Sequence, residues 1–400
     1  MVPRGSKKQI AVAVTLFVLC ATASATVQLG IDVLGDNTYA QLRGKRVGLI
    51  TNQTGVNSRG VRTRVLLKQN CNLVALYTPE HGLEGREKAG RYVKSRRDPA
   101  TGLTAYSLYG PTRKPTPSML RGIDVLVFDI QDIGCRSYTY ISTMGKCMEA
   151  AAENNIEFVV LDRPNPLGGL RVEGPKVDPG WISFVGQFPI PYVHGMTIGE
   201  LAKMINAEGW IAGRCRLTVV TMHGWTRDMT WTETGLRWVP TSPNIPKATS
   251  PLYYVATGTV GELSGPETGI GGYAPFEVIS ANWLNAESFT RYLKSLYMPG
   301  VYFHEFRRGR QQGSLLHIDP GAPADLTGLG VFMLAELNRT SGFTLFRRTS
   351  RSKLNLFFKV YGSSSIRSQL EHGESASDIV GSWKADVVRF RKERAAYLLY

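Results

Sequence analysis

The chain has 400 residues, of which 43% are hydrophobic and 20% are charged. This composition excludes wholesale disorder, and the length is sufficient for two domains with a sizeable core. The formal net charge of +15 comes from 47 basic and 32 acidic residues spread along the chain. Because no basic helix or aromatic-basic repeat stands out, an anionic surface or polymer is favoured over a nucleic acid as partner, and a solvated basic surface with no specific partner is the alternative.

The first 25 residues are typical of an export signal. Lys7 and Lys8 precede an apolar stretch from Ile10 to about Cys20, and residues 23–25 have the small-x-small form of a signal-peptidase site. The stretch is short for a membrane span, and no later segment approaches about 20 uninterrupted apolar residues. We therefore expect a mature chain that is periplasmic or extracellular, with no stable membrane insertion after cleavage.

Four cysteines remain beyond this segment: Cys71, Cys135, Cys147 and Cys215. Their pairing cannot be deduced from the sequence. None lies in a CxxC pair, so a zinc knot or a thioredoxin-type site is not expected. Small buried side chains are the simplest interpretation.

Short apolar runs recur through the first half of the chain, at 46–50, 72–77, 103–109, 124–130 and 157–162. Several are almost continuously hydrophobic, as expected of strands buried on both faces. Helical patterns precede the second run, at 62–70, and the fifth, at 140–155. This alternation predicts a parallel sheet with covering helices. No GxGxxG follows the first run, so the dinucleotide fingerprint is missing and no cofactor is expected.

Polar side chains follow these runs, where the strands end. Ligands of open α/β sheets bind in the crevice outside the carboxyl ends of the strands. Any one of these side chains has an alternative explanation as a turn-former or helix cap, but five polar strand ends in succession predict a shared site. The side chains expected there are Asn52, Gln53, Glu80, His81, Asp129, Gln131, Asp132, Arg136, Tyr138, Asp162, Arg163 and Asn165.

After residue 170 the pattern changes. A Pro-rich loop carries His194 and leads into a helix with Thr197 as N-cap and Glu200 in the capping-box position, which gives Glu200 a structural explanation. Another strand is expected at 217–225, and the Pro- and Ser-rich segment 238–254 is typical of a boundary or rim loop. We place the boundary near residue 245, so that a domain at 26–245 precedes a smaller α+β domain at 246–400, with a strand-like segment at 353–361 and a C-terminal helix.

Hydrolysis of a glycosidic bond suits this collection of carboxylates. It requires a protonated carboxylic acid near the leaving oxygen, and usually a second carboxylate. Glu80, in a Gly-flanked turn at a strand end, fits the acid because partial burial raises the pKa of a carboxyl group. Asp129, Asp132 and Glu200 are candidates for the second role.

A metal hydrolase is the competing interpretation, with His81, Asp129, Asp132 and His194 as ligands. No HExxH or paired HxH supports it. Serine chemistry lacks a GxSxG, and the cysteines have no neighbouring base in the sequence.

Several motifs closely resemble a bacterial family long described as a domain of unknown function and now associated with NamZ-type exo-β-N-acetylmuramidases. They are GLITNQTGV, PEHGLEG, DPATGLTAYSLYGPTRKPT, IDVLVFDIQDIGCRSYTYISTM, VVLDRPNPLGG, HGMTIGELA and SPNIP. The resemblance runs from about Leu29 to Tyr400. It implies a Rossmann-like N-terminal domain, a smaller C-terminal domain, a site in the cleft between them, and release of terminal N-acetylmuramic acid from the non-reducing end of peptidoglycan fragments. It also implies that Glu80, in PEHG, is the general acid and that Glu200, in HGMTIGE, is more than a cap.

The chain departs from the family pattern at LSGPETGIGGYAPFE, where many members carry a Ser-Glu-Gly-Arg-Gly-Thr stretch. The resemblance implies that the absent arginine holds the substrate's lactyl carboxylate, so muramyl specificity is a weaker expectation than hydrolysis, and the candidates to replace it are Arg136, Arg163 or the basic rim. A glycan- or cell-wall-binding protein with an idle site is the alternative to the enzyme. The predicted catalytic residues are Glu80, Glu200 and Asp129, and the predicted substrate-binding residues are Asn52, Gln53, His81, Gln131, Asp132, Arg136, Tyr138, Arg163, Asn165 and His194.

Overall fold

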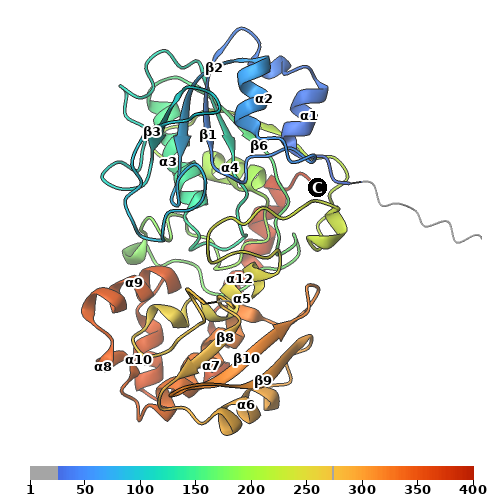
Figure 1. Cartoon of the computed structure of the whole chain (residues 1–400). Coiled ribbons are helices and arrows are strands. Elements are labelled where there is room, and N and C mark those ends of the chain that lie inside the picture. Colours follow the sequence, from blue (N-terminus) through green and yellow to red (C-terminus); the bar gives the residue numbers. More distant parts are fainter. Residues whose placement is uncertain (1–25, 273) are drawn as a thin grey trace, which may run out of the picture.

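The computed structural model describes residues 26–272 and 274–400, so the predicted export signal lies outside the described residues. Within these ranges none of the helices has the length and apolar character needed to cross a membrane. Two domains lie one above the other in Figure 1, with the N-terminal domain at the top.

A seven-stranded sheet forms the centre of the N-terminal domain. Its order is β3 (Arg96–Arg97), β4 (Thr104–Ser107), β2 (Asn72–Thr78), β1 (Arg46–Thr51), β5 (Val125–Asp129), β6 (Glu157–Leu161) and β7 (Arg216–Val220). All neighbours pair in parallel except β3, which is antiparallel to β4. The strand order reverses at β1, so the carboxyl ends of β1 and β5 form the switch point where such sheets bind ligands.

Helices cover both faces of this sheet. On one face α1 (Gly30–Asp36) and α2 (Thr63–Asn70) share a core with Leu49, Val127 and Val159. On the other, α3 (Tyr140–Glu153) and α4 (Ile198–Ala207) pack on the alternate residues of the same strands. This alternation explains why the central strands are apolar almost throughout. The α4 N-terminus has the predicted capping box of Thr197 and Glu200.

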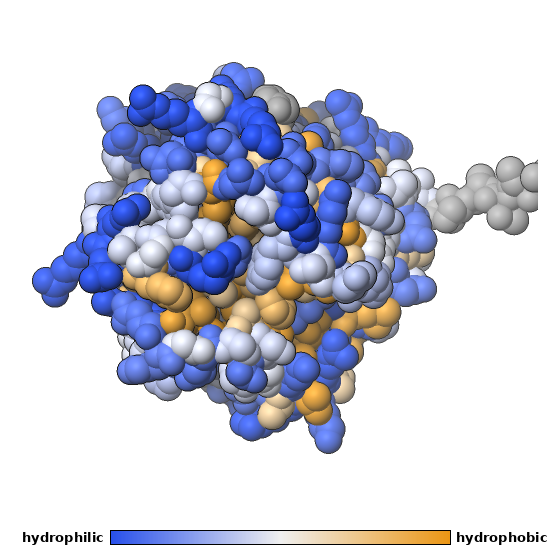
Figure 2. Space-filling model, turned by 90° about the horizontal axis from the view of Figure 1, so that it is seen from below, coloured by the Kyte–Doolittle hydropathy of each residue, from blue (hydrophilic) through white to orange (hydrophobic). Residues whose placement is uncertain are grey.

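The C-terminal domain contains a small antiparallel sheet in the order β8 (Val278–Ala281), β10 (Gln311–Ile318) and β9 (Val301–Arg308). Its helices are α5 (Ser250–Thr257), α6 (Ala286–Ser295), α7 (Leu326–Thr340), α8 (Leu345–Arg348), α9 (Arg351–Tyr361), α10 (Ser365–Glu371), α11 (Ala376–Ser382) and α12 (Lys384–Arg394). Seen from this end of the molecule, hydrophilic residues form the rim and apolar residues gather across the middle (Figure 2). The predicted fold class, a mainly parallel α/β domain with a smaller α+β domain, is confirmed.

The strand-like segment at 353–361 is helical, so that prediction was wrong. It forms most of α9, whose N-cap Ser350 accepts a hydrogen bond from the backbone N–H of Lys353. The buried side chains Phe357, Val360 and Tyr361 recur at helical spacing, so they line one face of a helix rather than one side of a strand.

The chain crosses between the domains twice. It enters the C-terminal domain before α5, and α12 brings it back to the N-terminal domain (Figure 1). There the Tyr400 hydroxyl donates to Asp162 Oδ2 at 2.8 Å, and Arg394 donates to the carbonyl oxygen of His194 at 2.9 Å. The C-terminal segment therefore belongs to the structure around the ends of β6 and α4.

Candidate active site

Glu80 lies two residues after β2, at the carboxyl edge of the sheet, and its side chain is almost completely buried. Oε1 accepts a hydrogen bond from the backbone N–H of Gly90 at 2.7 Å, and Oε2 accepts one from the Thr139 hydroxyl at 2.8 Å. Thr139 is the N-cap residue of α3. The carboxyl group is thus held between its own turn and the first turn of the next helix, which fixes its orientation.

Tyr109, beyond the end of β4, lies next to Glu80. Burial raises the pKa of its hydroxyl far above the ordinary value, and the neighbouring Glu80 carboxylate raises it further. The hydroxyl therefore keeps its proton and serves Glu80 as a donor. The guanidinium of Arg113 lies over the rings of Tyr109 and Phe184, 5.5 and 4.3 Å from their centres, so an aromatic and cationic surface adjoins the carboxyl group.

The turn that carries Glu80 has an unusual backbone. His81 and Gly82 have φ angles of 67° and 76°, and only the glycine adopts this region without steric cost. His81 Nδ1 lies 2.7 Å from the carbonyl oxygen of Glu87, so its imidazole fixes the turn from within. This contact gives His81 a positioning role for Glu80.

Segment 240–242 covers the carboxyl edge of the sheet and forms hydrogen bonds with two of the predicted substrate-binding side chains. Gln53 Nε2 donates to the carbonyl oxygens of Pro240 and Thr241, at 2.8 and 2.9 Å. The Tyr138 hydroxyl donates to Thr241 Oγ1 at 2.8 Å, and the Tyr140 hydroxyl donates to the Thr241 carbonyl at 2.6 Å. Gln53 and Tyr138 therefore position the cover of the site.

At the switch point, Asp129 and Arg163 form a buried ion pair. Arg163 Nε donates to Asp129 Oδ1 at 2.6 Å, and its Nη2 donates to the carbonyl oxygen of Val56 at 2.7 Å. Asp129 Oδ2 and Asn52 Nδ2 are buried without a hydrogen-bond partner among the described residues. Asn52 Oδ1 accepts from Thr54, so the ends of β1, β5 and β6 form one polar network.

A second polar group lies beside this network, at the ends of β5 and β6. Gln131, Asp132, Asn165 and His194 surround a small cavity. Burial raises the pKa of Asp132 to about 7, and burial with the nearby cations Arg394 and Arg136 lowers the pKa of His194 to about 3. His194 is therefore neutral at physiological pH, whereas Asp132 titrates there.

The Glu200 carboxylate forms no hydrogen bond with the described residues around this small cavity. Its Oε2 accepts the N-cap hydrogen bond from Thr197 N, and its Oε1 accepts from Arg227 and from the backbone N–H of Leu399. The side chain is 0% exposed. The charged guanidinium of Arg227 thus pairs with a carboxylate that has no exposed surface, which is the arrangement of a structural carboxylate.

Arg136 also turns away from the site, and its predicted substrate contact finds no support in its position. The guanidinium donates to four main-chain carbonyls, those of Pro175, Ile190, Val360 and Tyr361. Two of these belong to the N-terminal domain and two to α9. Arg136 therefore joins the two domains.

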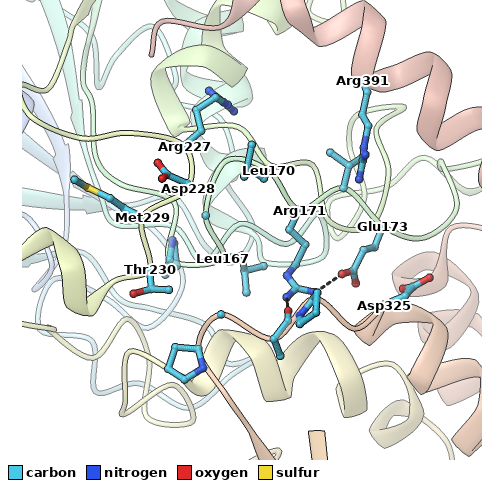
Figure 3. A pocket seen from close by; sticks show the side chains of 17 residues that line it. Leu167, Leu170, Arg171, Glu173, Arg227, Asp228, Met229, Thr230, Asp325 and Arg391 are labelled. Atoms are coloured by element: carbon cyan, nitrogen blue, oxygen red, sulfur yellow. Dashed lines mark hydrogen bonds and ion pairs between the residues drawn. The ribbon is translucent and has the colours of Figure 1, made fainter. Parts of the chain in front are cut away.

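A large cavity lies elsewhere, between the loops after β6 and β7 and the 320–325 segment of the C-terminal domain. Its volume is about 480 Å³, and none of the predicted site residues lines it. Figure 3 shows Arg171 in this cavity directed toward Glu173 and the C-terminal domain. Arg171 is hydrogen-bonded to the carbonyl oxygens of Ala322 and Ala324, so much of the polar lining is occupied in joining the domains.

Sequence reasoning did not identify Tyr109 and Thr139, which lie against Glu80, or Thr241, which contacts Gln53 and Tyr138. The strand-end rule that selected Glu80 also points to Tyr109, the last residue of the third apolar run. Thr139 has the ordinary signature of a helix cap, and Thr241 lies in a segment interpreted as a boundary loop. Over residues 26–272 and 274–400, no group of three or more His, Cys, Asp and Glu residues is arranged to hold a metal ion.

Comparison with known proteins gives consistent matches over both domains. The N-terminal and C-terminal models of the exo-beta-N-acetylmuramidase NamZ family match residues 47–249 and 252–400. The peptidoglycan beta-N-acetylmuramidase NamZ of Bacillus subtilis (strain 168) is 43% identical over 387 residues, which cover 94% of this chain and 91% of that protein.

Two solved structures of DUF1343 family proteins from Bacteroides fragilis NCTC 9343 share the fold. One has a TM-score of 0.88 and 45% identity, and the other a TM-score of 0.72 and 30% identity; each match covers 94% of this chain and 99% of the other. The chain therefore belongs to the NamZ family of exo-β-N-acetylmuramidases and is a glycosidase.

Proposed function

We propose that this glycosidase releases terminal N-acetylmuramic acid from the non-reducing end of peptidoglycan fragments, with Glu80 as general acid. The observation that carries the assignment to Glu80 is its setting: a nearly buried carboxyl group at the carboxyl edge of the sheet, held by Gly90 and Thr139 and adjoining Tyr109. The substrate follows from the B. subtilis relative, whose name specifies peptidoglycan, and from the family.

The chemistry assigned to Glu80 is proton donation to the leaving glycosidic oxygen as the bond to the sugar breaks. Its two fixed hydrogen bonds hold the carboxyl group in one orientation, and the protonated Tyr109 hydroxyl donates to the carboxylate that forms when the proton has left. The guanidinium of Arg113 lies over the ring of Tyr109 and has no assigned role in this step.

The candidates for the second carboxylate of the mechanism lie at the end of β5. Asp129 and Asp132 each keep one oxygen without a partner among the described residues, whereas both oxygens of Glu200 are occupied. This favours the two aspartates over Glu200 for stabilising a cationic transition state or activating water.

The test compares Glu80→Gln with the wild type on a chromogenic β-N-acetylmuramide. We expect kcat to fall by roughly 10²- to 10⁴-fold, the usual contribution of general acid catalysis, with an unchanged melting temperature. Glu84→Gln is the matched control, because Glu84 lies in the same turn but its half-buried carboxylate pairs with Arg62 and Arg64. Full activity in Glu80→Gln would remove Glu80 from the mechanism.

Export to the periplasm or beyond the cell belongs to the same proposal, because intact peptidoglycan lies outside the cytoplasmic membrane. It rests on the lysines, apolar stretch and small residues of segment 1–25. N-terminal sequencing of the protein recovered from the host should give Thr26 as the first residue. Recovery of the uncleaved chain from the cytoplasm alone would contradict this.

A further inference from the structure

The small cavity between the ends of β5 and β6 is lined by buried polar atoms that have no partner among the described residues. Asp132 Oδ1, Gln131 Oε1 and His194 Nε2 are all in this state, and each of these residues is at least nine-tenths buried. Unpartnered buried polar atoms are rare because each costs free energy, so three around one cavity indicate a missing partner. The cavity volume of about 10 Å³ has room for about one oxygen atom.

The neighbouring hydrogen bonds define what this partner must be. His194 Nδ1 accepts a hydrogen bond from the backbone N–H of Met196 at 3.2 Å, so in the neutral imidazole the proton resides on Nε2, which is then a donor. Gln131 Nε2 donates to two carbonyl oxygens, those of Asp132 and Pro164, which leaves Gln131 Oε1 as an acceptor. The cavity thus offers one donor and two acceptors, which suits a hydroxyl oxygen and is unsuitable for a cation facing the Nε2–H group.

A larger cavity of about 210 Å³ adjoins the small one at the switch point of the sheet. The two share Gln131 and Arg163 as wall residues. Trp231 and Trp238 also line the larger cavity, with the exposed Arg237 at its edge. Aromatic side chains with a few fixed polar groups are the usual lining of a ligand site, and this volume is below that of drug-sized pockets, as suits a single ring.

Gln53 lies between the larger cavity and the turn that carries Glu80. Gln53 lines the cavity, and its amide packs so closely on Gly85 that a Cβ atom there would lie 2.1 Å from it. Gly85 therefore has to be glycine for the turn to close on this wall. A saccharide bound at the switch point is thus separated from the Glu80 turn by one side chain.

We propose that Gln131, Asp132 and His194 bind one hydroxyl group of the saccharide whose ring occupies the cavity lined by Trp231 and Trp238. The inference rests on the proposed function for the identity of the saccharide. His194 Nε2–H donates to the hydroxyl oxygen, and the hydroxyl hydrogen is donated to Asp132 Oδ1. When the hydroxyl hydrogen rotates away from Asp132, Gln131 Oε1 accepts it instead. The site therefore selects for a saccharide that has a hydroxyl group directed into this cavity.

The test measures binding and turnover separately. Binding of the disaccharide N-acetylmuramyl-β-1,4-N-acetylglucosamine is measured by calorimetry in the Glu80→Gln background, with and without Asp132→Asn or His194→Ala. We expect each additional change to weaken binding by roughly 10- to 100-fold, as for loss of a hydrogen bond to a charged or buried group. Ser142→Ala is the matched control, because Ser142 Oγ is equally buried and unpartnered but lines neither cavity, and its affinity should be unchanged.

Deoxy analogues of the disaccharide, each lacking one hydroxyl group, identify the interaction. For one analogue, Asp132→Asn should have no further effect on affinity, because the group it would bind is already absent. Equal weakening of the parent and of every analogue would overturn the proposal and leave the cavity as a site for structural water. Unchanged affinity in both variants would overturn it as well. Because these measurements need no turnover, a wild type that fails to hydrolyse muramides refutes the proposed function and not this site.

Discussion

Replacing Arg136 by Met tests whether this residue joins the domains or binds substrate. The substitution keeps an unbranched apolar side chain in place of the arginine stem and removes four hydrogen bonds, of 2.6, 2.8, 3.2 and 2.7 Å, to carbonyls on both sides of the domain junction. Burial lowers the pKa of Arg136 to about 10, still far above neutrality, so a full buried charge is lost with them. Each hydrogen bond to a charged group contributes about 1.5–3 kcal/mol, and part of their loss is offset because a buried charge no longer has to be desolvated, so we expect a net loss of about 3–5 kcal/mol.

Urea denaturation followed by tryptophan fluorescence measures this loss. We expect the midpoint for Arg136→Met to fall by an amount equivalent to about 3–5 kcal/mol, with an earlier, separate transition for the C-terminal domain. Arg367→Met is the control, because Arg367 forms an exposed i,i+4 pair with Glu371 that contributes less than about 1 kcal/mol. A stable Arg136→Met variant with a strongly raised KM for the muramide would refute this reasoning and return Arg136 to the substrate.

Three further predictions concern charge and redox state. The wild type should lose stability as pH rises from 5 to 8, because the folded-state pKa of Asp132 is raised to about 7 and the buried carboxyl group has to ionise through that range. Asp132→Asn has no such group, so its stability relative to the wild type should increase by roughly 2–3 kcal/mol over the same range. Paired denaturation curves at the two pH values check this, and parallel pH profiles would contradict it. Glu200→Gln should lower the melting temperature, because it removes the negative charge that pairs with Arg227, but it should leave kcat of the folded enzyme near the wild-type value. A loss of kcat like that of Glu80→Gln would show a catalytic role for Glu200. Dithiothreitol should leave the melting temperature unchanged, because the four cysteines of the described residues are free, and a thermal shift assay that shows a decrease would disprove this.

The fold class was predictable because its signals are local and repeated. Apolar runs at regular spacing require a sheet covered on both faces, and the strand-end rule follows from the parallel topology. The wrong strand at 353–361 shows the limit of this reasoning. A run of nine residues with large apolar side chains fits either period until the neighbouring helices determine which face is buried.

The partners of the site residues could not be predicted, because they come from distant segments. Gln53 and Tyr138 have the right residue types and the right edge of the sheet for sugar contacts, but segment 240–242 folds back onto them. Arg136 was predicted to contact substrate, but it donates to carbonyls of α9, more than 200 residues later in the chain. The position of Glu80 at the carboxyl edge follows from local sequence, because its own turn supplies one of its two hydrogen bonds, whereas its catalytic role stays a prediction.

The double crossing of the chain between the domains restricts how they can move. A body attached at a single point turns freely, whereas one attached at two points rotates only about the line that joins them. Here the first attachment precedes α5, and the second is α12 with the segment that contacts Asp162 and His194 (Figure 1). Any opening of the domains to admit a glycan is therefore a rotation about one axis, and substitutions at the two attachments alter its rate without changing an atom that contacts sugar.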